Sequence, residues 1–220
     1  EELDPEGLWY VEPWDVTGIS CPYRRGFEAE ARPPGDFFPP YHLDTLRAVL
    51  RRTGGDVSVH SEVYSPFSQL LELLGYEAAL LALMDDPGKA HACLERLTGG
   101  AAELACAQAE TGVDAVLISS AFAGDGFISP RHYEEFVLPY ERRLVASVRE
   151  HAPGVKVYTH TCGGIGDRLE LMLETGTQGI DPLDPPPLGT VELEDAVRVL
   201  KGRAFIKGNV DPVHTLLHAG

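Results

Sequence analysis

The sequence predicts an α/β protein built on a parallel sheet, and three observations lead to this fold class. From residue 56 onward, short strand-like runs alternate with longer helix-like segments. The helix-like segments repeat apolar residues every three or four positions, and two begin with the start signals Asp86-Pro87 and Ser129-Pro130. A polar cluster follows each strand-like run. In parallel α/β folds, the carboxyl ends of the strands carry the functional residues.

Five strands are expected, at residues 56–60, 114–119, 155–160, 178–182 and 203–207. A closed (β/α)8 barrel, or TIM barrel, needs eight strand–helix units. The other strands then lie either outside this sequence or within its first quarter. An open doubly wound sheet is the competing fold, although no GxGxxG motif stands between a strand and a helix here.

Three helices are predicted, each with one apolar face to bury. The first is capped by Asp86 and ends before Gly112, and its face consists of Ala90, Cys93, Leu94, Leu97, Ala101 and Leu104. The second is capped by Ser129, and its face consists of Tyr133, Phe136, Val137, Tyr140, Leu144 and Val148. The third precedes Gly176, and its face consists of Ile165, Leu169, Met172 and Leu173.

The sequence divides into two predicted parts that differ in composition. Residues 1–55 are rich in proline, glycine and aromatic residues, which indicates an irregular lead-in or lid. Residues 56–220 form the predicted α/β domain. The sequence does not begin with Met and shows no signal-peptide pattern, so we expect a fragment or a trimmed form of a longer protein.

Charge and cysteine content restrict the class of partner. The formal charge of −16 argues against nucleic acid and against an anionic membrane surface, because both need clustered Lys and Arg. No apolar run is long enough to span a bilayer. Widely spaced cysteines at Cys21, Cys93, Cys106 and Cys162 favour reduced thiols and a cytoplasmic protein. A small-molecule substrate is therefore expected.

The segment His160-Thr161-Cys162-Gly163-Gly164 is the most informative polar cluster. Residues two apart on a strand point to the same side, so the imidazole of His160 and the sulfur of Cys162 are expected to converge. Both groups are good zinc ligands, although a catalytic zinc needs three protein ligands. A helix starting after the glycines would lower the thiol pKa. Alternatively, His160 hydrogen-bonds to substrate or backbone and Cys162 only packs.

Other candidates follow the remaining strands. Asp125 and Asp181 are candidate catalytic residues, and each also fits a turn. Candidate substrate-binding residues are Tyr64, Ser120 and Asn209. Asp211 is expected to cap a helix that begins at Pro212 rather than to act in catalysis.

Taken in order, these clusters resemble the uroporphyrinogen decarboxylase superfamily. ISPRHYEEFVLPYERRL resembles a family helix, and SSAFAGDGFISP is similar to the family's Ser-x-Ala-Gly loop with one additional residue. THTCGGIGDRLELMLETGTQGIDPLDP and FIKGNVDPVHTLL resemble the last part of the family barrel, including its Gly-Asn-x-Asp-Pro motif. The resemblance runs from about residue 56 to 217 and implies an incomplete (β/α)8 barrel with its site at the strand C-termini.

The resemblance implies one of two chemistries. True decarboxylases remove acetate carboxyl groups from uroporphyrinogen III without a metal and use an Arg-rich N-terminal segment, which is not visible here. The methyltransferase branch moves a methyl group between a corrinoid and a thiol or similar acceptor, using zinc held by His-x-Cys and a later Cys. His160-Thr161-Cys162 resembles the second branch, whose third ligand would lie beyond the end of this sequence.

We therefore expect a zinc-dependent methyltransferase with His160 and Cys162 as metal ligands and a separate corrinoid protein as partner. Uroporphyrinogen carries eight carboxylates, yet Lys207 is the one basic residue that stands out in the strand-end clusters. The alternatives are a metal-free decarboxylase of porphyrin biosynthesis, in which His160 orients a substrate carboxylate, and a non-catalytic relative that binds a small molecule.

Overall fold

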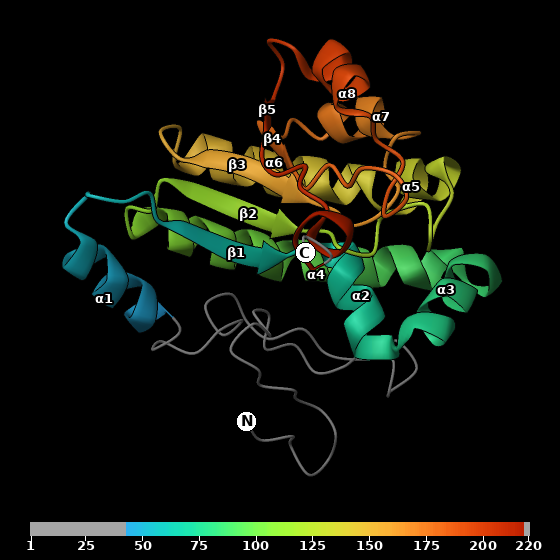
Figure 1. Cartoon of the computed structure of the whole chain (residues 1–220). Coiled ribbons are helices and arrows are strands. Elements are labelled where there is room, and N and C mark those ends of the chain that lie inside the picture. Colours follow the sequence, from blue (N-terminus) through green and yellow to red (C-terminus); the bar gives the residue numbers. More distant parts are fainter. Residues whose placement is uncertain (1–42, 218–220) are drawn as a thin grey trace.

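The computed structural model describes residues 43–217, which form an open sheet of five parallel strands with helices between them (Figure 1). The strands are β1 (His60–Tyr64), β2 (Ala115–Ser119), β3 (Lys156–His160), β4 (Gly179–Asp181) and β5 (Phe205–Ile206). The helices are α1 (Asp44–Thr53), α2 (Pro66–Leu74), α3 (Tyr76–Asp85), α4 (Pro87–Glu110), α5 (Pro130–Phe136), α6 (Leu138–His151), α7 (Leu169–Glu174), α8 (Leu193–Leu200) and the π-helix η2 (Pro212–Leu217).

The strand order decides between the two folds that the sequence left open. The strands are adjacent in chain order, β1-β2-β3-β4-β5, and every pair is parallel. A doubly wound sheet reverses its order at a switch point, whereas a (β/α)8 barrel adds each strand beside the previous one. The described strands therefore form a barrel-type α/β sheet with five of the eight strands of a closed barrel.

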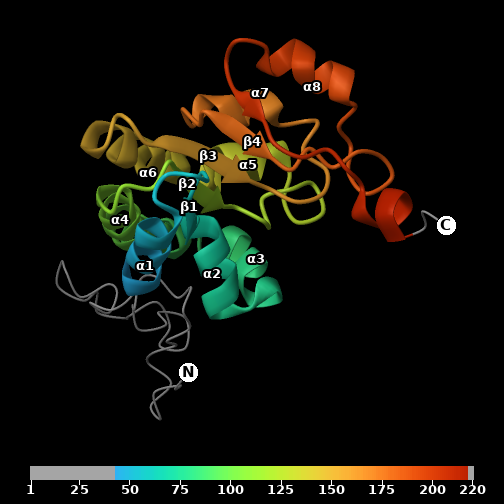
Figure 2. The same ribbon diagram turned by 60° about the vertical axis from the view of Figure 1, so that its left-hand side comes forward.

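Within residues 43–217, helices cover one face of the sheet, and we call the opposite face the concave face. Helices α4 and α6 pack side by side behind the sheet in Figure 1, and the turned view of Figure 2 shows the same pair of neighbours. Strand β1 shows the consequence, because Ser61 and Val63 are buried under the helices while His60 and Glu62 on the opposite, concave face are exposed. The predicted apolar faces of the helices account for the covered side, and the residues named for the first helix are all buried in α4.

Helix starts follow the predicted signals. Asp86 Oδ1 accepts a hydrogen bond from the Lys89 amide at the start of α4, and Ser129 Oγ accepts one from the His132 amide at the start of α5. Ser65 caps α2 in the same way, and its following residue is again proline. These local signals place the beginnings of three helices.

The long helix predicted after Ser129 is instead two helices. Val137 interrupts the helical path between α5 and α6. Pro139 explains the break, since it has no amide hydrogen to donate to the Glu135 carbonyl and its ring crowds that carbonyl. The predicted apolar stripe is still buried on both sides of the break.

Two further expectations need correction near the N-terminal end of the described chain. The first strand was predicted at residues 56–60 but runs from His60 to Tyr64, because polar residues are tolerated on the concave face of the sheet. Residues 44–53 of the predicted irregular lead-in form helix α1, which ends at Gly54 in a left-handed conformation. The rest of the predicted lead-in, with Cys21, lies outside the described residues.

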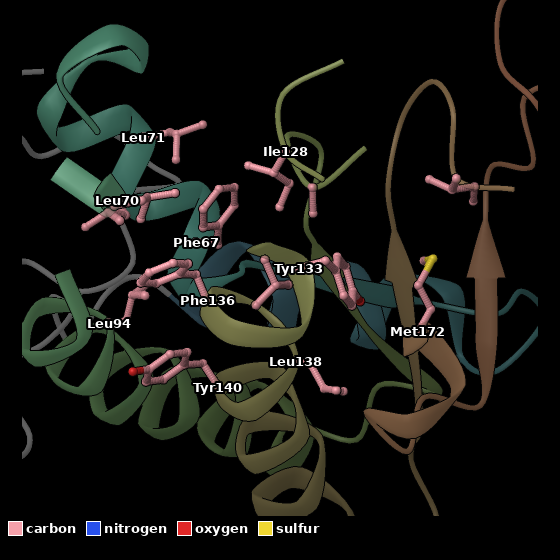
Figure 3. Close-up of a cluster of buried hydrophobic side chains, with 14 of the residues drawn as sticks. Phe67, Leu70, Leu71, Leu94, Ile128, Tyr133, Phe136, Leu138, Tyr140 and Met172 are labelled. Carbon is pink, nitrogen blue, oxygen red and sulfur yellow. The ribbon is translucent and has the colours of Figure 1, made fainter. Parts of the chain in front are cut away.

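The core lies between the sheet and its helices and beside α2 and α5. Phe67 of α2 and Phe136 of α5 belong to one buried cluster with Leu94 and Met172 (Figure 3). Of the described cysteines, Cys93 is buried, Cys106 is half-buried and Cys162 is exposed. Between residues 43 and 217 no single helix has the length and apolarity to cross a membrane; only the bent pair α2–α3 passes that test jointly.

Candidate functional site

The carboxyl ends of the five strands bring one side chain from each strand into a single row. Strand register pairs Tyr64 with Ser119, Ser119 with His160, and His160 with Asp181. Lys207 continues the row, since its amide donates to the Ile180 carbonyl and Ile206 pairs with Ile180. We call these five residues, Tyr64, Ser119, His160, Asp181 and Lys207, the terminal row. It forms the rim of the concave face, where parallel barrels place their sites.

His160 and Cys162 converge as the sequence predicts. His160 Nε2 lies 3.1 Å from Cys162 Sγ, and Cys162 is exposed. The neighbouring Gly163 has a φ of 76°, a left-handed conformation that glycine adopts without strain, and its amide donates to Asp184 Oδ2 at 2.7 Å. The turn after β3 is therefore fixed by a carboxylate from the turn after β4.

The environment of the thiol differs from the prediction. Cys162 is exposed, yet neighbouring groups shield its thiol from part of the solvent; this partial desolvation raises the pKa of the thiol, and the nearby carboxylates of Asp184 and Asp181 raise it further. The expected helix N-terminus is not at the thiol, because α7 begins only at Leu169. Without a cation beside it, this sulfur is held as a neutral thiol near neutral pH.

Asp181 lies between two basic groups of the terminal row. Its Oδ2 is 3.1 Å from Lys207 Nζ and 3.7 Å from His160 Nδ1. The imidazole thus has a carboxylate on its Nδ1 side and a sulfur on its Nε2 side. At 3.7 Å the carboxylate is too far from Nδ1 for a hydrogen bond, but its charge favours a proton on Nδ1 and so leaves Nε2 for a metal or a proton.

Tyr64 reaches the terminal row as the last residue of β1. The corrected register explains this position, because a strand from residue 60 to 64 points His60, Glu62 and Tyr64 toward the concave face. His60, predicted as the last residue of this strand, is its first residue and lies one strand length away from the rim. Tyr64 is half-buried.

The structure does not bring Ser120 to the concave face. Ser120 is fully buried, and its amide donates to the His160 carbonyl at 2.8 Å. Its hydroxyl faces the helix side, where the carboxyl of Glu141 from α6 is also fully buried. Ser119, the residue before it, takes the position on the terminal row. Alternation along β2 separates the two serines onto opposite faces.

Glu141 is a buried titratable residue that the sequence analysis missed. Burial raises its pKa from the ordinary 4.5 to about 7, and the hydroxyls of Ser120 and Tyr133 oppose this effect only in part. Neither carboxyl oxygen reaches good hydrogen-bond geometry among the described residues. A signal was present, because Glu141 lies four residues after Val137 and three before Leu144, on the apolar stripe of the helix.

Asp125 supports the loop after β3 rather than joining the terminal row. Its amide donates to the Gly164 carbonyl at 2.8 Å, and its carboxyl packs so closely on Gly164 that a Cβ there would collide with it. A Cβ on Gly124 would stand only 2.6 Å from the carbonyl oxygen of Cys162, so this position requires glycine. Asp125 also borders a cavity of about 410 Å³ with Asp167, Thr190, Glu192 and neighbouring residues.

Asn209 and Asp211 serve the loop after β5. The Asn209 side chain donates to the Leu183 carbonyl at 2.7 Å, which ties this loop to the one after β4. Asp211 Oδ1 accepts hydrogen bonds from the amides of Val213 and His214 at the start of η2. The predicted capping role of Asp211 is confirmed. The amide group of Asn209 is engaged within the protein, although the residue is half-buried rather than enclosed.

The donor set fits zinc in part. An imidazole nitrogen and a sulfur converge on one point, and the next acidic group, Asp181, lies behind the imidazole rather than beside the sulfur. Across residues 43–217, no three His, Cys, Asp or Glu side chains are arranged to hold a metal. His160 and Cys162 therefore supply two of the three protein ligands that a catalytic zinc requires.

Barrel topology and a polar rim at the strand C-termini define this chain as part of a TIM-barrel protein with a candidate active site. The sequence profile of the uroporphyrinogen decarboxylase (URO-D) family matches residues 28–220. The chain therefore belongs to the URO-D family. This finding confirms the resemblance drawn from the strand-end clusters.

Similar proteins carry two different names. Uroporphyrinogen decarboxylases from Edwardsiella ictaluri and Thioalkalivibrio sulfidiphilus are 29% and 32% identical over 81% and 78% of this chain, and over 50% and 49% of their own length. A solved methyltransferase from Methanosarcina mazei superposes with a TM-score of 0.67, with 18% identity over 83% of this chain and 56% of that one. This chain spans about half the length of the curated relatives it matches. The superposition shows a shared fold.

Proposed function

We propose that this chain carries the metal-binding part of a zinc-dependent methyltransferase that moves a methyl group between a corrinoid and a thiol or similar acceptor. The observation that carries the proposal is the convergence of His160 Nε2 and Cys162 Sγ, 3.1 Å apart, at the rim of the sheet. A third ligand would come from residues outside the described part of the chain. Bound zinc would supply the charge that stabilises an acceptor thiolate near neutral pH.

The residues around the pair have defined tasks in this proposal. Asp181 would orient the imidazole by its charge near Nδ1, and Asp184 holds the turn that carries Cys162. Tyr64 and Ser119 border the same rim and would contact the acceptor. The acceptor and a separate corrinoid protein would both approach from the strand C-termini.

Metal content tests the proposal directly. The full-length protein, purified without chelator, should contain about one zinc per chain by elemental analysis, and Cys162→Ser should lose most of it. Cys106→Ser is the matched control, because Cys106 is a half-buried thiol near the C-terminal end of α4 and its replacement should leave the zinc content unchanged. Equal zinc in wild type and Cys162→Ser would contradict the assignment of the ligands.

Porphyrinogen decarboxylation is the second candidate, favoured by the names of the curated relatives. In that reaction Lys207 and His160 would contact substrate carboxylates, and no metal would be needed. The terminal row is poorly suited to a substrate with eight carboxylates, since Lys207 is its one Lys or Arg and is already paired with Asp181. Conversion of uroporphyrinogen by the metal-free protein would select this candidate. Tight small-molecule binding without either activity would favour a non-catalytic relative.

A further inference from the structure

Behind the terminal row, a chain of polar contacts crosses the concave face. Lys207 Nζ lies 3.1 Å from both Tyr158 Oη and Asp181 Oδ2. Tyr158 Oη is 2.9 Å from His60 Nδ1, and His60 Nε2 is 2.8 Å from Ser58 Oγ. Groups from β1, β3, β4 and the end of β5 are therefore joined in one network, and its last member, Asp181, is the carboxylate behind His160.

Hydrogen-bond chemistry fixes the direction of this network. A lysine ammonium can only donate, so the Tyr158 oxygen accepts from Lys207 and its own proton is free to go to His60 Nδ1. The same ammonium donates to a carboxylate, which is a charge-assisted bond. Lys207 is therefore held between a neutral acceptor and a negative one.

Tyr158, at the centre of the network, is buried and closely packed. The Tyr158 side chain is 1% exposed, and its ring packs against His60 and Phe205 with centroids 5.5 Å away in each case. The ammonium of Lys207 also lies 5.0 Å from the centroid of the Tyr158 ring, within range of a cation–π attraction. Burial lowers the pKa of Lys207, but the hydrogen bonds to Tyr158 and Asp181 outweigh it and raise the pKa overall.

Lys207 holds the same carboxylate oxygen that faces the imidazole. Asp181 Oδ2 is closer to Lys207 Nζ, at 3.1 Å, than to His160 Nδ1, at 3.7 Å. Without the lysine, nothing in the described structure ties this oxygen to its present place except the imidazole itself. A free aspartate could rotate away, and His160 would lose the nearby negative charge that favours a proton on Nδ1.

We propose that Tyr158 and Lys207 are positioning residues, which hold Asp181 against Nδ1 of His160 and so direct Nε2 toward Cys162. Neither residue needs to touch a metal or a substrate for this role. The orientation of the imidazole is a property of the chain itself, and its value for zinc binding rests on the proposed function. Residues behind a metal ligand typically change metal affinity about tenfold to a hundredfold when they are removed.

The test measures the imidazole and the metal separately. Ring-nitrogen NMR of histidine-labelled, metal-free full-length protein in mildly alkaline buffer reports which nitrogen of His160 carries the proton, with His160→Gln identifying the signal. Wild type should show the proton on Nδ1. Lys207→Met and Tyr158→Phe should each shift the ring toward a mixture of the two neutral forms, as Asp181→Asn should. Lys156→Met is the matched control, because Lys156 is an exposed lysine on β3, the strand that carries Tyr158 and His160.

Zinc calorimetry on the same variants completes the experiment. Lys207→Met and Tyr158→Phe should weaken zinc binding about tenfold to a hundredfold, with Lys156→Met unchanged. An unaltered His160 signal in both variants would overturn the positioning role. If wild type binds no zinc but the NMR signals shift as expected, the proposed methyltransferase fails while the positioning role stands. Two variants are used so that a folding defect in one, detected by circular dichroism, leaves the other decisive.

Discussion

The two faces of the sheet treat polar groups in opposite ways. On the concave face, Lys207 donates hydrogen bonds to the Tyr158 hydroxyl and to Asp181, so the polar groups there are paired. On the helix-covered face, the hydroxyl of Ser120, the residue after β2, lies in the core beside the Glu141 carboxyl, and neither group has a good hydrogen-bond partner among the described residues. Paired polar groups cost little even where they are buried, whereas an unpaired polar group in a core destabilises the fold. The comparison thus distinguishes polar residues that are paired at the candidate site from polar residues that destabilise the core.

The largest expected contrast between the faces is in packing. Leu117 and Ile118 are adjacent on β2 and lose the same number of carbons when changed to alanine, but Ile118 is fully buried under the helices and Leu117 is only half-buried on the concave side. Ile118→Ala should reduce the free energy of unfolding by about 4 kcal/mol and Leu117→Ala by about 1 kcal/mol, measured by urea denaturation of the full-length protein. Equal losses would show that the concave face is as tightly covered as the helix side.

The next contrast is a pH dependence located on the covered face. Because the folded pKa of Glu141 is about 7, against an ordinary 4.5, the folded state keeps a proton that the unfolded chain has lost between these two pH values. The contribution to stability is fully present below about pH 4.5, falls as pH rises and is lost above about pH 7. This single residue should account for a decrease of about 3 kcal/mol across that range.

Glu141→Gln should flatten that part of the stability–pH curve, which thermal unfolding at a series of pH values would measure. Glu62→Gln provides the control, because Glu62 is an exposed carboxylate on the concave face and its replacement should preserve the slope. If wild type and Glu141→Gln change stability with pH in parallel, the carboxyl is not the source of the dependence.

The smallest expected difference compares two tyrosine hydroxyls. Tyr158→Phe removes a hydroxyl that is hydrogen-bonded to Lys207 and His60, and should reduce the free energy of unfolding by about 1 kcal/mol. Tyr133→Phe removes a buried hydroxyl without good hydrogen-bond geometry and should be neutral or slightly stabilising. Chemical denaturation of both variants measures the pair. A greater loss for Tyr133→Phe would mean that its hydroxyl supports Glu141 more strongly than the geometry indicates.

Much of the fold could be predicted because its signals are local. Cap residues with a following proline marked the starts of α4 and α5, and alternation of strands and helices gave the α/β class. The break at Val137 required weighing Pro139 against a strong apolar stripe. The start of β1 was placed too early because His60 and Glu62 interrupt the apolar pattern, and the sequence alone does not show which face of the sheet the helices cover.

The parts of the candidate site that lie on one short segment could be predicted, whereas the parts that depend on the register between strands could not. His160 and Cys162 share one short segment, so the period of a strand was enough to bring them together. The partnership of Asp181 with Lys207 needed the register between β4 and β5, which local sequence does not give. The burial of Ser120 and Glu141 depends on how α6 packs against the sheet, which local sequence does not give.

The terminal row has a consequence for how such proteins diverge. Backbone amides and carbonyls hold the ladder between the strands, while each of the five side chains on the rim projects from a different strand. Exchanging one of them replaces a donor, an acceptor or a nucleophile without disturbing the hydrogen bonds that maintain the scaffold. Decarboxylation and group transfer can thus arise on a common architecture through a few substitutions at the ends of the strands, and each substitution can occur independently of the others.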